Sequence, residues 1–421
     1  MLVGLALRCV PLGRYVTPDE PNWVYRSIGF GDALAAGDWS AIPPTGHPGV
    51  TTMWLGAAGI FAQRRLNPAE SARHLDWIRR LAWLDPESGE AFRHLGFFLS
   101  AGRMAVVLVN ALTLGILGLM LSRLFDRLTA LIGVGLLALD PYLIGHSGLL
   151  HTDALLANLT LLGLVGALIG LQEPRRTVWW PLVGLLAGLA LLTKSPALIL
   201  LAFVPLLLGV GYLLSALRGS EQRAGCFRLL LHGSLFLASV AVTFCALHPG
   251  MWSDPIATVR TAFTLADRHL TSVQRPVFFA GRMVMRPGPA FYPLVLLFRA
   301  SPVAVIALIG GLILVRRLPP DRRFALLSLL LFVALFTAGL SLGTKKHARY
   351  LLPVFPPLSL AAAAAARAWL SRRLDGRTRP DMSALRLAGL LIILPQAVIA
   401  LVFSAYPLTY ENPLLGGRFV A

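Results

Sequence analysis

Charged residues are scarce in this sequence, and their scarcity excludes most classes of soluble protein. Asp, Glu, Lys and Arg make up 14% of the 421 residues, and 56% are hydrophobic. A soluble domain carries roughly 25% charged residues. An ordinary soluble enzyme, a disordered chain and a nucleic-acid binder are therefore excluded, although the formal net charge is +18. Only three scattered cysteines occur, so neither a disulfide framework nor a paired-cysteine metal site is available.

The sequence contains many long apolar segments, which indicate a polytopic membrane protein. A spanning helix needs about 20 mostly apolar residues. Residues 1–13 are apolar but short, carry Arg8, and are expected to be the end of a first span whose beginning is missing. A signal peptide fits less well, because no small-residue cleavage site follows. We predict one all-α membrane domain, residues 1–421, of about 10–11 transmembrane helices. The ten full segments are 97–121, 128–144, 152–171, 178–193, 196–217, 229–247, 291–315, 324–343, 350–369 and 385–405.

The loops between these segments alternate in charge. One set of five short loops holds 15 arginines against 6 acidic residues, whereas the long loop 14–98 holds 8 arginines against 9. Basic residues collect in cytoplasmic loops, so the short set is predicted to be cytoplasmic. The long loops 14–98 and 248–290 then lie outside. The five short loops are 122–127, 172–177, 218–228, 316–323 and 371–383.

Both long outside loops are predicted to contain a helix. Asn67-Pro68-Ala69-Glu70 has the residues of a helix start, and apolar residues including Trp77 follow on one side. Ser253-Asp254-Pro255 begins a second helix with Ile256 and Phe263 on one side. Two interfacial helices of this kind would frame a lateral entrance for a lipid. The alternative is that both helices only cover the bundle.

Lysine is almost absent, and the few lysines lie on the unexpected side. Lys194, Lys345 and Lys346 are the only three, and all fall at the outside ends of spans. Cations placed against the positive-inside trend favour an anionic ligand at the outer face. Contact with outer-leaflet head groups is the alternative. The stretch Thr344–Tyr350 adds Arg349 and Tyr350 to two of these lysines, which suits a phosphate, although a snorkelling interfacial cluster would have the same composition.

Carboxylates at the same membrane boundary are the candidate catalytic residues. Asp19 and Glu20 are adjacent, bracketed by prolines, and follow the first apolar segment. Partial desolvation there would raise a carboxylate pKa and suit it to general-base work; the alternative is a solvated loop pair. Asp153 opens the third full apolar segment, where it could also serve the helix dipole. The topology predicts that these acids, Lys194, His248 and residues 345–350 meet at one outer-face site.

Seven stretches in this order resemble the lipid-carrier-dependent glycosyltransferases of the GT-C fold. Relatives in that group are the dolichyl-phosphate-mannose–protein mannosyltransferases, the aminoarabinose lipid A transferases and bacterial prenyl-phosphate-sugar enzymes. The resemblance covers nearly the whole chain. The stretches are TPDEPNW (17–23), GHPGVTTMW (46–54), HTDALLANLTLLG (151–163), LLTKSPALI (191–199), HPGMWSDP (248–255), FFAGRMVMRPGPAFYP (278–293) and KKHARYLLPVFPPLSL (345–360).

The resemblance implies a role for each candidate. Asp19 would be the general base, with Glu20 and Asp153 as supporting acids. The carrier phosphate would be bound by Lys194, Lys345, Lys346, Arg349 and Tyr350. Some relatives bind a divalent metal at the phosphate; His47 and His248 would be the metal or acceptor ligands here, although no HxxxH spacing supports them.

The function implied is inverting transfer of a sugar from a polyprenyl-phosphate carrier to an acceptor hydroxyl, on the extracytoplasmic side of a membrane that is expected to be the bacterial plasma membrane. The acceptor would be a protein, a lipid or a glycan. A transporter or flippase of lipid-linked saccharide is the alternative, but the sequence shows no repeat between its halves. A non-catalytic membrane subunit is the second alternative, against which the outside acids and lysines argue. Many relatives continue beyond the position of Ala421, so a truncated C-terminal region is expected as well.

Overall fold

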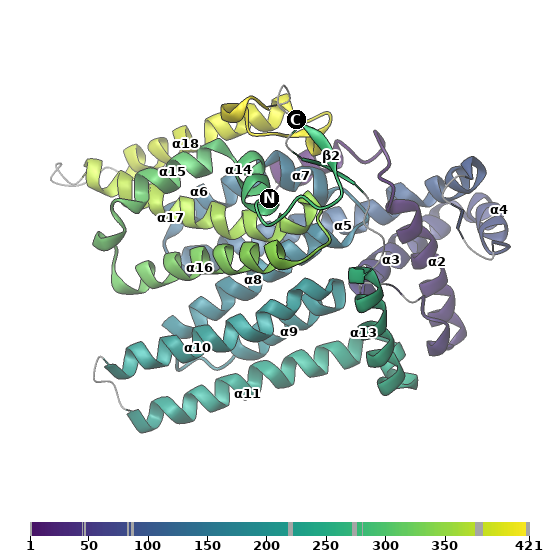
Figure 1. Cartoon of the computed structure of the whole chain (residues 1–421), viewed down its shortest axis with the longest axis horizontal. Helices are drawn as coiled ribbons and strands as arrows, with labels where there is room; N and C mark the ends of the chain where they lie inside the picture. Colours follow the sequence, from purple (N-terminus) through teal and green to yellow (C-terminus); the bar gives the residue numbers. More distant parts are fainter. Residues whose placement is uncertain are drawn as a thin grey trace.

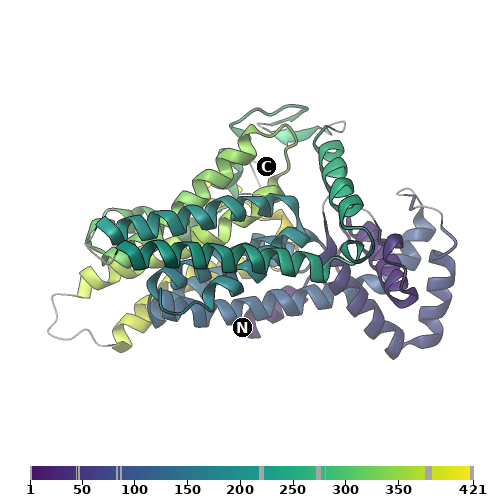
Figure 2. The same ribbon diagram turned by 90° about the horizontal axis from the view of Figure 1, so that it is seen from below.

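The structure is a computed structural model of the chain, and it is almost entirely helical (Figure 1). Long helices run side by side in a bundle, and shorter helices project from one end (Figure 2). The residues that the structure describes are 2–43, 45, 48–81, 84–85, 88–217, 222–271, 276–279, 281–374 and 382–417.

Each of the ten predicted apolar segments coincides with a helix or a bent pair of helices. Among the described residues, six helices are long and apolar enough to cross a membrane, and up to eight if each bent pair counts as one span. The six include α5 (Gly89–Leu124), α8 (Thr152–Gln172), α10 (Ile199–Leu217), α11 (Gln222–Leu247), α16 (Pro320–Leu342) and α17 (Phe355–Leu374). The remaining two segments form α9 (Trp179–Thr193) and α18 (Met382–Val402), whose apolar parts are shorter.

The two bent pairs break at a proline. Helix α6 (Arg127–Ala138) meets α7 (Pro141–Ser147) at 65°, and α14 (Phe291–Arg299) meets α15 (Pro302–Leu312) at 101°. Proline disfavours a helical residue before it, so each helix ends there. The bend frees backbone carbonyls inside an apolar bundle, where an unpaired polar group is costly. Arg8 of α1 (Leu2–Cys9), which is buried, donates to the carbonyls of Leu137 and Ala138 at 3.3 and 3.2 Å.

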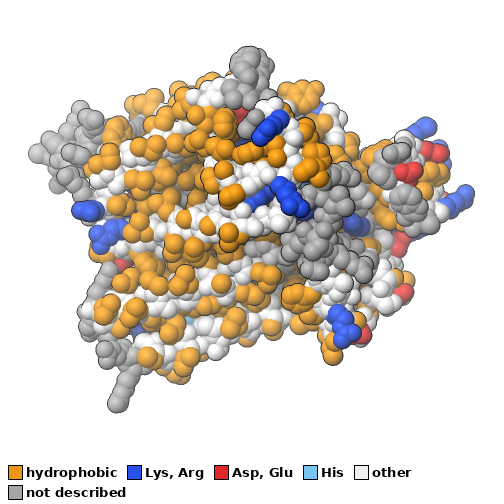
Figure 3. Space-filling view, viewed as in Figure 1, with side chains coloured by type: hydrophobic (Ala, Val, Ile, Leu, Met, Phe, Trp, Pro, Cys, Tyr) orange, Lys and Arg blue, Asp and Glu red, His pale blue; other side chains and the backbone are white. Residues whose placement is uncertain are grey.

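Helices α9 and α11 approach closely because α9 carries glycines at the contact. A Cβ at Gly184 would lie 2.4 Å from the Phe236 carbonyl oxygen, and one at Gly188 would lie 2.7 Å from Thr243. Small residues at such contacts are typical of membrane helices. At the centre of the bundle, α8 is buried over most of its length. Large apolar side chains are exposed on the outer surface of the bundle, as expected for a surface that faces lipid (Figure 3).

Three of the five basic loops lie together at one end of the bundle. Arg123, in the last turn of α5, contacts Glu173 at 2.6 Å, and Asp126, just before α6, contacts Arg322 at 3.0 Å and Arg367 at 3.4 Å. These contacts join turns that the charge pattern assigns to one side. Helices of the two long loops lie at the opposite end (Figure 1). The fold agrees with the predicted alternation for these three basic loops. Most of the loop 371–383 and the start of the loop 218–228 lie outside the described residues.

The opposite end is built from α2 (Glu20–Ala36), α3 (Val50–Leu66), α4 (Pro68–Ile78), the short α12 (Gly250–Ser253) and α13 (Pro255–Thr271). Helix α4 begins at Pro68 as predicted, but its Leu75 and Ile78 are buried in a cluster with α3 and α5. It therefore covers the bundle. Helix α13 keeps an apolar side exposed, with Ile256 at 74% and Phe263 at 68%, which suits an interfacial helix.

Candidate functional site

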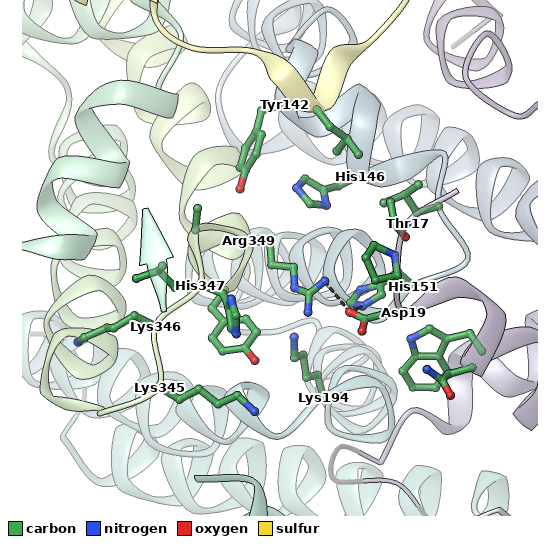
Figure 4. A pocket seen from close by; sticks show the side chains of 18 of the residues that line it. Thr17, Asp19, Tyr142, His146, His151, Lys194, Lys345, Lys346, His347 and Arg349 are labelled. Carbon is green, nitrogen blue, oxygen red and sulfur yellow. Dashed lines mark hydrogen bonds and ion pairs between the residues drawn. The ribbon is translucent and has the colours of Figure 1, made fainter. Parts of the chain in front are cut away.

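A polar cavity of about 810 Å³ opens at the end of the bundle that carries the long loops (Figure 4). The hairpin of β1 (Val277–Phe279) and β2 (Arg282–Val284) borders it through Val277 and the following Met285. Segments far apart in the chain supply its charged lining. Six of the predicted site residues line this cavity: Asp19, Lys194, Lys345, Lys346, Arg349 and Tyr350.

Asp19 holds the carboxylate that is open to the cavity. It occupies the position before the first residue of α2, makes no side-chain cap there, and leaves 40% of its side chain exposed. Its Oδ2 lies 2.6 Å from Arg349 Nη1 and 3.3 Å from His151 Nε2. Figure 4 shows the three side chains pointing toward one another. Asp19 is therefore placed between a permanent cation and a titratable imidazole.

His151 and Arg349 lower the pKa of Asp19, although the sequence predicts a raised pKa. Desolvation alone would raise it, as the sequence led us to expect. In the structure, the hydrogen bond with His151 and the charge of Arg349 hold the pKa of Asp19 well below its usual range, against the opposing effect of burial. Favourable charges outweigh desolvation because the carboxylate is only partly removed from water. In this state Asp19 is a weak base.

Asp153 lies beneath the cavity and holds its cations in place. It is 2% exposed in the first turn of α8, and its Oδ1 lies 2.5 Å from Lys194 Nζ. Its Oδ2 lies 3.0 Å from His151 Nδ1 and 3.7 Å from Arg349 Nε. Burial lowers the pKa of His151, but the nearby Asp153 and Asp19 carboxylates raise it by more, so the net pKa is raised. The two carboxylates therefore favour the protonated form of His151.

Glu20 does not face the cavity. It is fully buried and receives two bonds of 2.6 Å from Arg103 of α5. The backbone and hydroxyl of Thr17 and the Leu150 amide also donate to it, at 2.9, 2.9 and 3.1 Å. Arg103 in turn donates to carbonyls of the preceding loop, at Leu12 and Tyr15. The pair therefore anchors the loop that presents Asp19.

We expect Glu20→Gln to lower the free energy of unfolding by about 3–5 kcal/mol, because it leaves the buried Arg103 charge uncompensated. Asp32→Asn is the matched control, since Asp32 pairs with Arg79 at the surface, where a pair contributes under about 1 kcal/mol. Denaturation of both purified variants in detergent measures the difference. Equal stability of the two variants would contradict the anchoring role.

The segment that joins α16 to η4 (Ala348–Val354) carries Lys345 and Lys346, and it is not helical. Lys346 Nζ turns back to the end of α16 and donates to the Leu340 and Ser341 carbonyls at 3.0 and 2.7 Å. The Lys345 ammonium points the other way, toward the Lys194 side of the cavity (Figure 4). His347 lies beside these cations; burial and the charges of Arg349, Lys345 and Lys194 lower its pKa to about 4. The segment therefore adds charge to the cavity through its lysines.

Of the two predicted histidines, only His248 belongs to the described residues, and it does not line this cavity. His47 lies outside the described residues. His248 is not among the residues that line the cavity; it follows α11, which packs on α9 at the outside of the bundle, and its ring lies against Phe244. The described residues also contain no group of three His, Cys, Asp or Glu side chains that could hold a metal ion.

The sequence did not single out several residues that the site uses. His151 stood in a quoted motif, directly beside Asp153, but no role was assigned to it. Arg103 is a lone charge within an apolar segment, a signal that a buried partner must exist. Arg26 and Arg299 line the cavity from α2 and α14; no motif marks either of them.

Comparison with known proteins decides the fold. A family model described as dolichyl-phosphate-mannose-protein mannosyltransferase matches residues 91–244. ArnT from Cupriavidus metallidurans bound to undecaprenyl phosphate is similar in structure, with a TM-score of 0.59 and 18% identity over 95% of this chain and 69% of that one. The chain has the GT-C fold. The resemblance carried by the sequence motifs is thereby confirmed.

Two further comparisons define the extent of the likeness. The apo state of the same ArnT gives a TM-score of 0.56 and 19% identity, over 97% of this chain and 71% of that one. Archaeal oligosaccharyltransferase AglB from Archaeoglobus fulgidus, in complex with an inhibitory peptide and a dolichol-phosphate, gives 0.55 and 16%, over 96% of this chain and 55% of AglB. No curated protein sequence matches the chain. The helical bundle of the GT-C fold is therefore the shared feature.

Proposed function

We propose that this protein is an inverting glycosyltransferase that moves a sugar from a polyprenyl-phosphate carrier to an acceptor hydroxyl at the extracytoplasmic face. One observation carries the proposal: the cavity joins a part-exposed carboxylate, Asp19, to a group of lysine and arginine side chains. A carboxylate beside a cation cluster suits transfer with a phosphate leaving group. The structures of ArnT with undecaprenyl phosphate and of AglB with dolichol-phosphate support a lipid-phosphate carrier.

In the proposed reaction the acceptor hydroxyl gives its proton to an Asp19 carboxylate oxygen. The acceptor oxygen attacks the anomeric carbon from the face opposite the phosphate, and a new glycosidic bond forms with inversion. The bond between the anomeric carbon and the phosphate oxygen breaks, and its electrons leave with the lipid phosphate. The phosphate gains one negative charge in this step, so Arg349 and Lys345 stabilise the transition state more than the bound donor.

Arg349 would link donor binding to the strength of the base. In the structure, Arg349 lies 2.6 Å from Asp19 and helps to keep its pKa low, so that Asp19 is weakly basic. A donor phosphate beside Lys345 competes for the same guanidinium, because Arg forms charge-assisted bonds with either anion. Sharing Arg349 with the phosphate raises the pKa of Asp19 when the acceptor must be deprotonated. The base is thus strengthened only in the loaded site.

A groove between α14 and α16 would hold the prenyl chain. It is lined by apolar side chains such as Leu296 and Val333 and ends at Ser341, the residue whose carbonyl binds Lys346. An apolar chain in this groove therefore has its phosphate end beside the lysine segment. This arrangement suits a donor that enters from the membrane.

The proposal is tested by incubating the purified protein in nanodiscs with radiolabelled polyprenyl-phosphate sugars and a cell-envelope extract. Label should leave the lipid carrier and appear in an acceptor that resists mild acid. Heat-treated protein is the control. Movement of intact labelled lipid between leaflets, without loss of its sugar, would instead support the flippase alternative.

Orientation is tested separately, by labelling single cysteines in intact cells after the three native cysteines have been replaced. We expect an impermeant reagent to label Arg73→Cys of α4 and to spare Arg176→Cys in the turn between α8 and α9, because the basic turns face the cytoplasm. The two sites are matched, since the native side chains are 77% and 63% exposed. The reverse labelling pattern would place the cavity on the cytoplasmic side.

A further inference from the structure

Arg26 is a cationic residue of the cavity wall that the proposed reaction does not use. It lies on α2, half-buried, and its guanidinium rests on the Trp23 ring at 5.3 Å from the ring centre. Within the described residues it makes no hydrogen bond and no ion pair. Burial lowers its pKa and the Asp19 charge acts only partly against this. Its charge is thus removed from water without a bonded anion.

The other cavity cations are already engaged. Arg349 pairs with Asp19, Lys194 pairs with Asp153, and Lys346 binds two backbone carbonyls. Arg299 pairs with Glu411 at 2.7 Å. A polyprenyl-phosphate sugar is a phosphodiester with one negative charge. Six lysine and arginine side chains line the cavity, against the three carboxylates of Asp19, Asp153 and Glu411 that pair with them. The cavity therefore carries more positive charge than one donor neutralises.

Helix α2, which carries Arg26, starts on the Asp19 side of the cavity, away from the lysine segment. Arg26 belongs to α2, the helix that Asp19 precedes, whereas Lys345 and Lys346 follow α16. In Figure 4, Thr17 and Asp19 lie together on one side of the cavity and the lysine segment lies on the other. Arg26 follows Asp19 by seven positions, and its guanidinium lies over Trp23, three residues nearer the start of α2.

We propose that Arg26 recognises an anionic group on the acceptor, so that the substrate class of this site is a hydroxyl compound that also carries a phosphate or a carboxylate. The inference rests on the proposed transfer reaction, because it assigns the acceptor side of the same cavity. Asp19 takes the proton of the reacting hydroxyl, and the anionic group binds to the Arg26 guanidinium in the same cavity. Arginine suits this role because its planar fork matches both phosphate and carboxylate.

The test measures binding and needs no turnover. The protein is placed in phosphatidylcholine nanodiscs loaded with undecaprenyl phosphate, so that the lysine segment is occupied. Binding of glycerol 3-phosphate, glycerate and glycerol is then followed by saturation-transfer NMR. These probes share a hydroxyl-bearing skeleton and differ in carrying a phosphate, a carboxylate or no charge. Arg26→Gln removes the cation, and Arg26→Lys keeps it while shortening its reach.

We expect the wild type to bind glycerol 3-phosphate or glycerate and not glycerol, with at least about tenfold weaker binding in Arg26→Gln from the loss of a charge-assisted bond. Arg26→Lys should retain part of the affinity, which a purely structural role on Trp23 would not require. The tighter of the two anions assigns the acceptor group. Unchanged affinity in Arg26→Gln, or equal binding of glycerol, would overturn the inference while leaving the transfer reaction itself untouched.

Discussion

Asp19→Asn is expected to lower the rate of sugar transfer by about 10²–10⁴-fold, the usual contribution of a general base. The amide is nearly isosteric with the carboxylate, and its oxygen can still accept a bond from Arg349. It cannot accept the acceptor's proton. Single-turnover transfer with a saturating labelled donor measures the loss, and donor affinity in the same preparation should stay close to that of the wild type.

Asp38→Asn is the control for this variant, because Asp38 is an exposed aspartate of the long loop 14–98. Among the described residues, its side chain bonds to the nearby Ser40 and Ala41. Asp153→Asn is the informative comparison. It removes the carboxylate that holds Lys194 and His151, so it should weaken donor binding and stability together with turnover. If Asp19→Asn retains near-normal turnover while Asp153→Asn has none, the base is misassigned.

The general position of the site could be predicted from the sequence, because the membrane topology follows from the composition of each segment taken by itself. Apolar length defines the spans, and loop charge defines their alternation. Together these bring Asp19, Lys194 and Arg349 to one end of the bundle, although 330 residues separate the first from the last. No side-chain detail is needed for that step.

The role of adjacent residues could not be predicted in the same way. Asp19 and Glu20 look equivalent in sequence, yet one faces the cavity and the other is buried. The difference arises from Arg103, which reaches Glu20 from a separate helix and needs a carboxylate to offset its own burial. Likewise, the low pKa of Asp19 depends on His151 and Arg349, whose contacts exist only after the helices have packed.

The directions of the Lys345 and Lys346 side chains could not be predicted from the sequence either. On a helix, adjacent residues would point about 100° apart. In the structure the helix α16 ends before them, and Lys346 bonds to the last carbonyls of that helix while Lys345 turns to the cavity. A cation at a helix C-terminus satisfies carbonyls that have no partner within the helix. Lys346 therefore bonds to the backbone at the end of α16, whereas the Lys345 ammonium points into the cavity.

Arg349→Met is expected to weaken donor binding by roughly 10–100-fold, through loss of a charge-assisted bond to the phosphate. The same change should alter the pH dependence of transfer. Asp19 acts as a base only when deprotonated, so activity is lost as the pH falls through its pKa. The group that faces Asp19 on the other side is His151, and Arg26 and Lys194 add positive charge nearby.

In the wild type, the acid limb of kcat/KM reports the free enzyme, in which Arg349 and His151 keep the pKa of Asp19 low. The acid limb of kcat reports the donor complex, in which Arg349 is shared with the phosphate. We therefore expect the kcat limb to lie at higher pH than the kcat/KM limb. In Arg349→Met the kcat/KM limb should move up toward the value of an ordinary carboxylate, about 3.9, so the separation between the limbs narrows. The control is Arg73→Met, at an exposed position on α4, which should leave the acid limbs of both kcat and kcat/KM in place. If the two limbs coincide in the wild type and neither moves in Arg349→Met, donor binding does not strengthen the base.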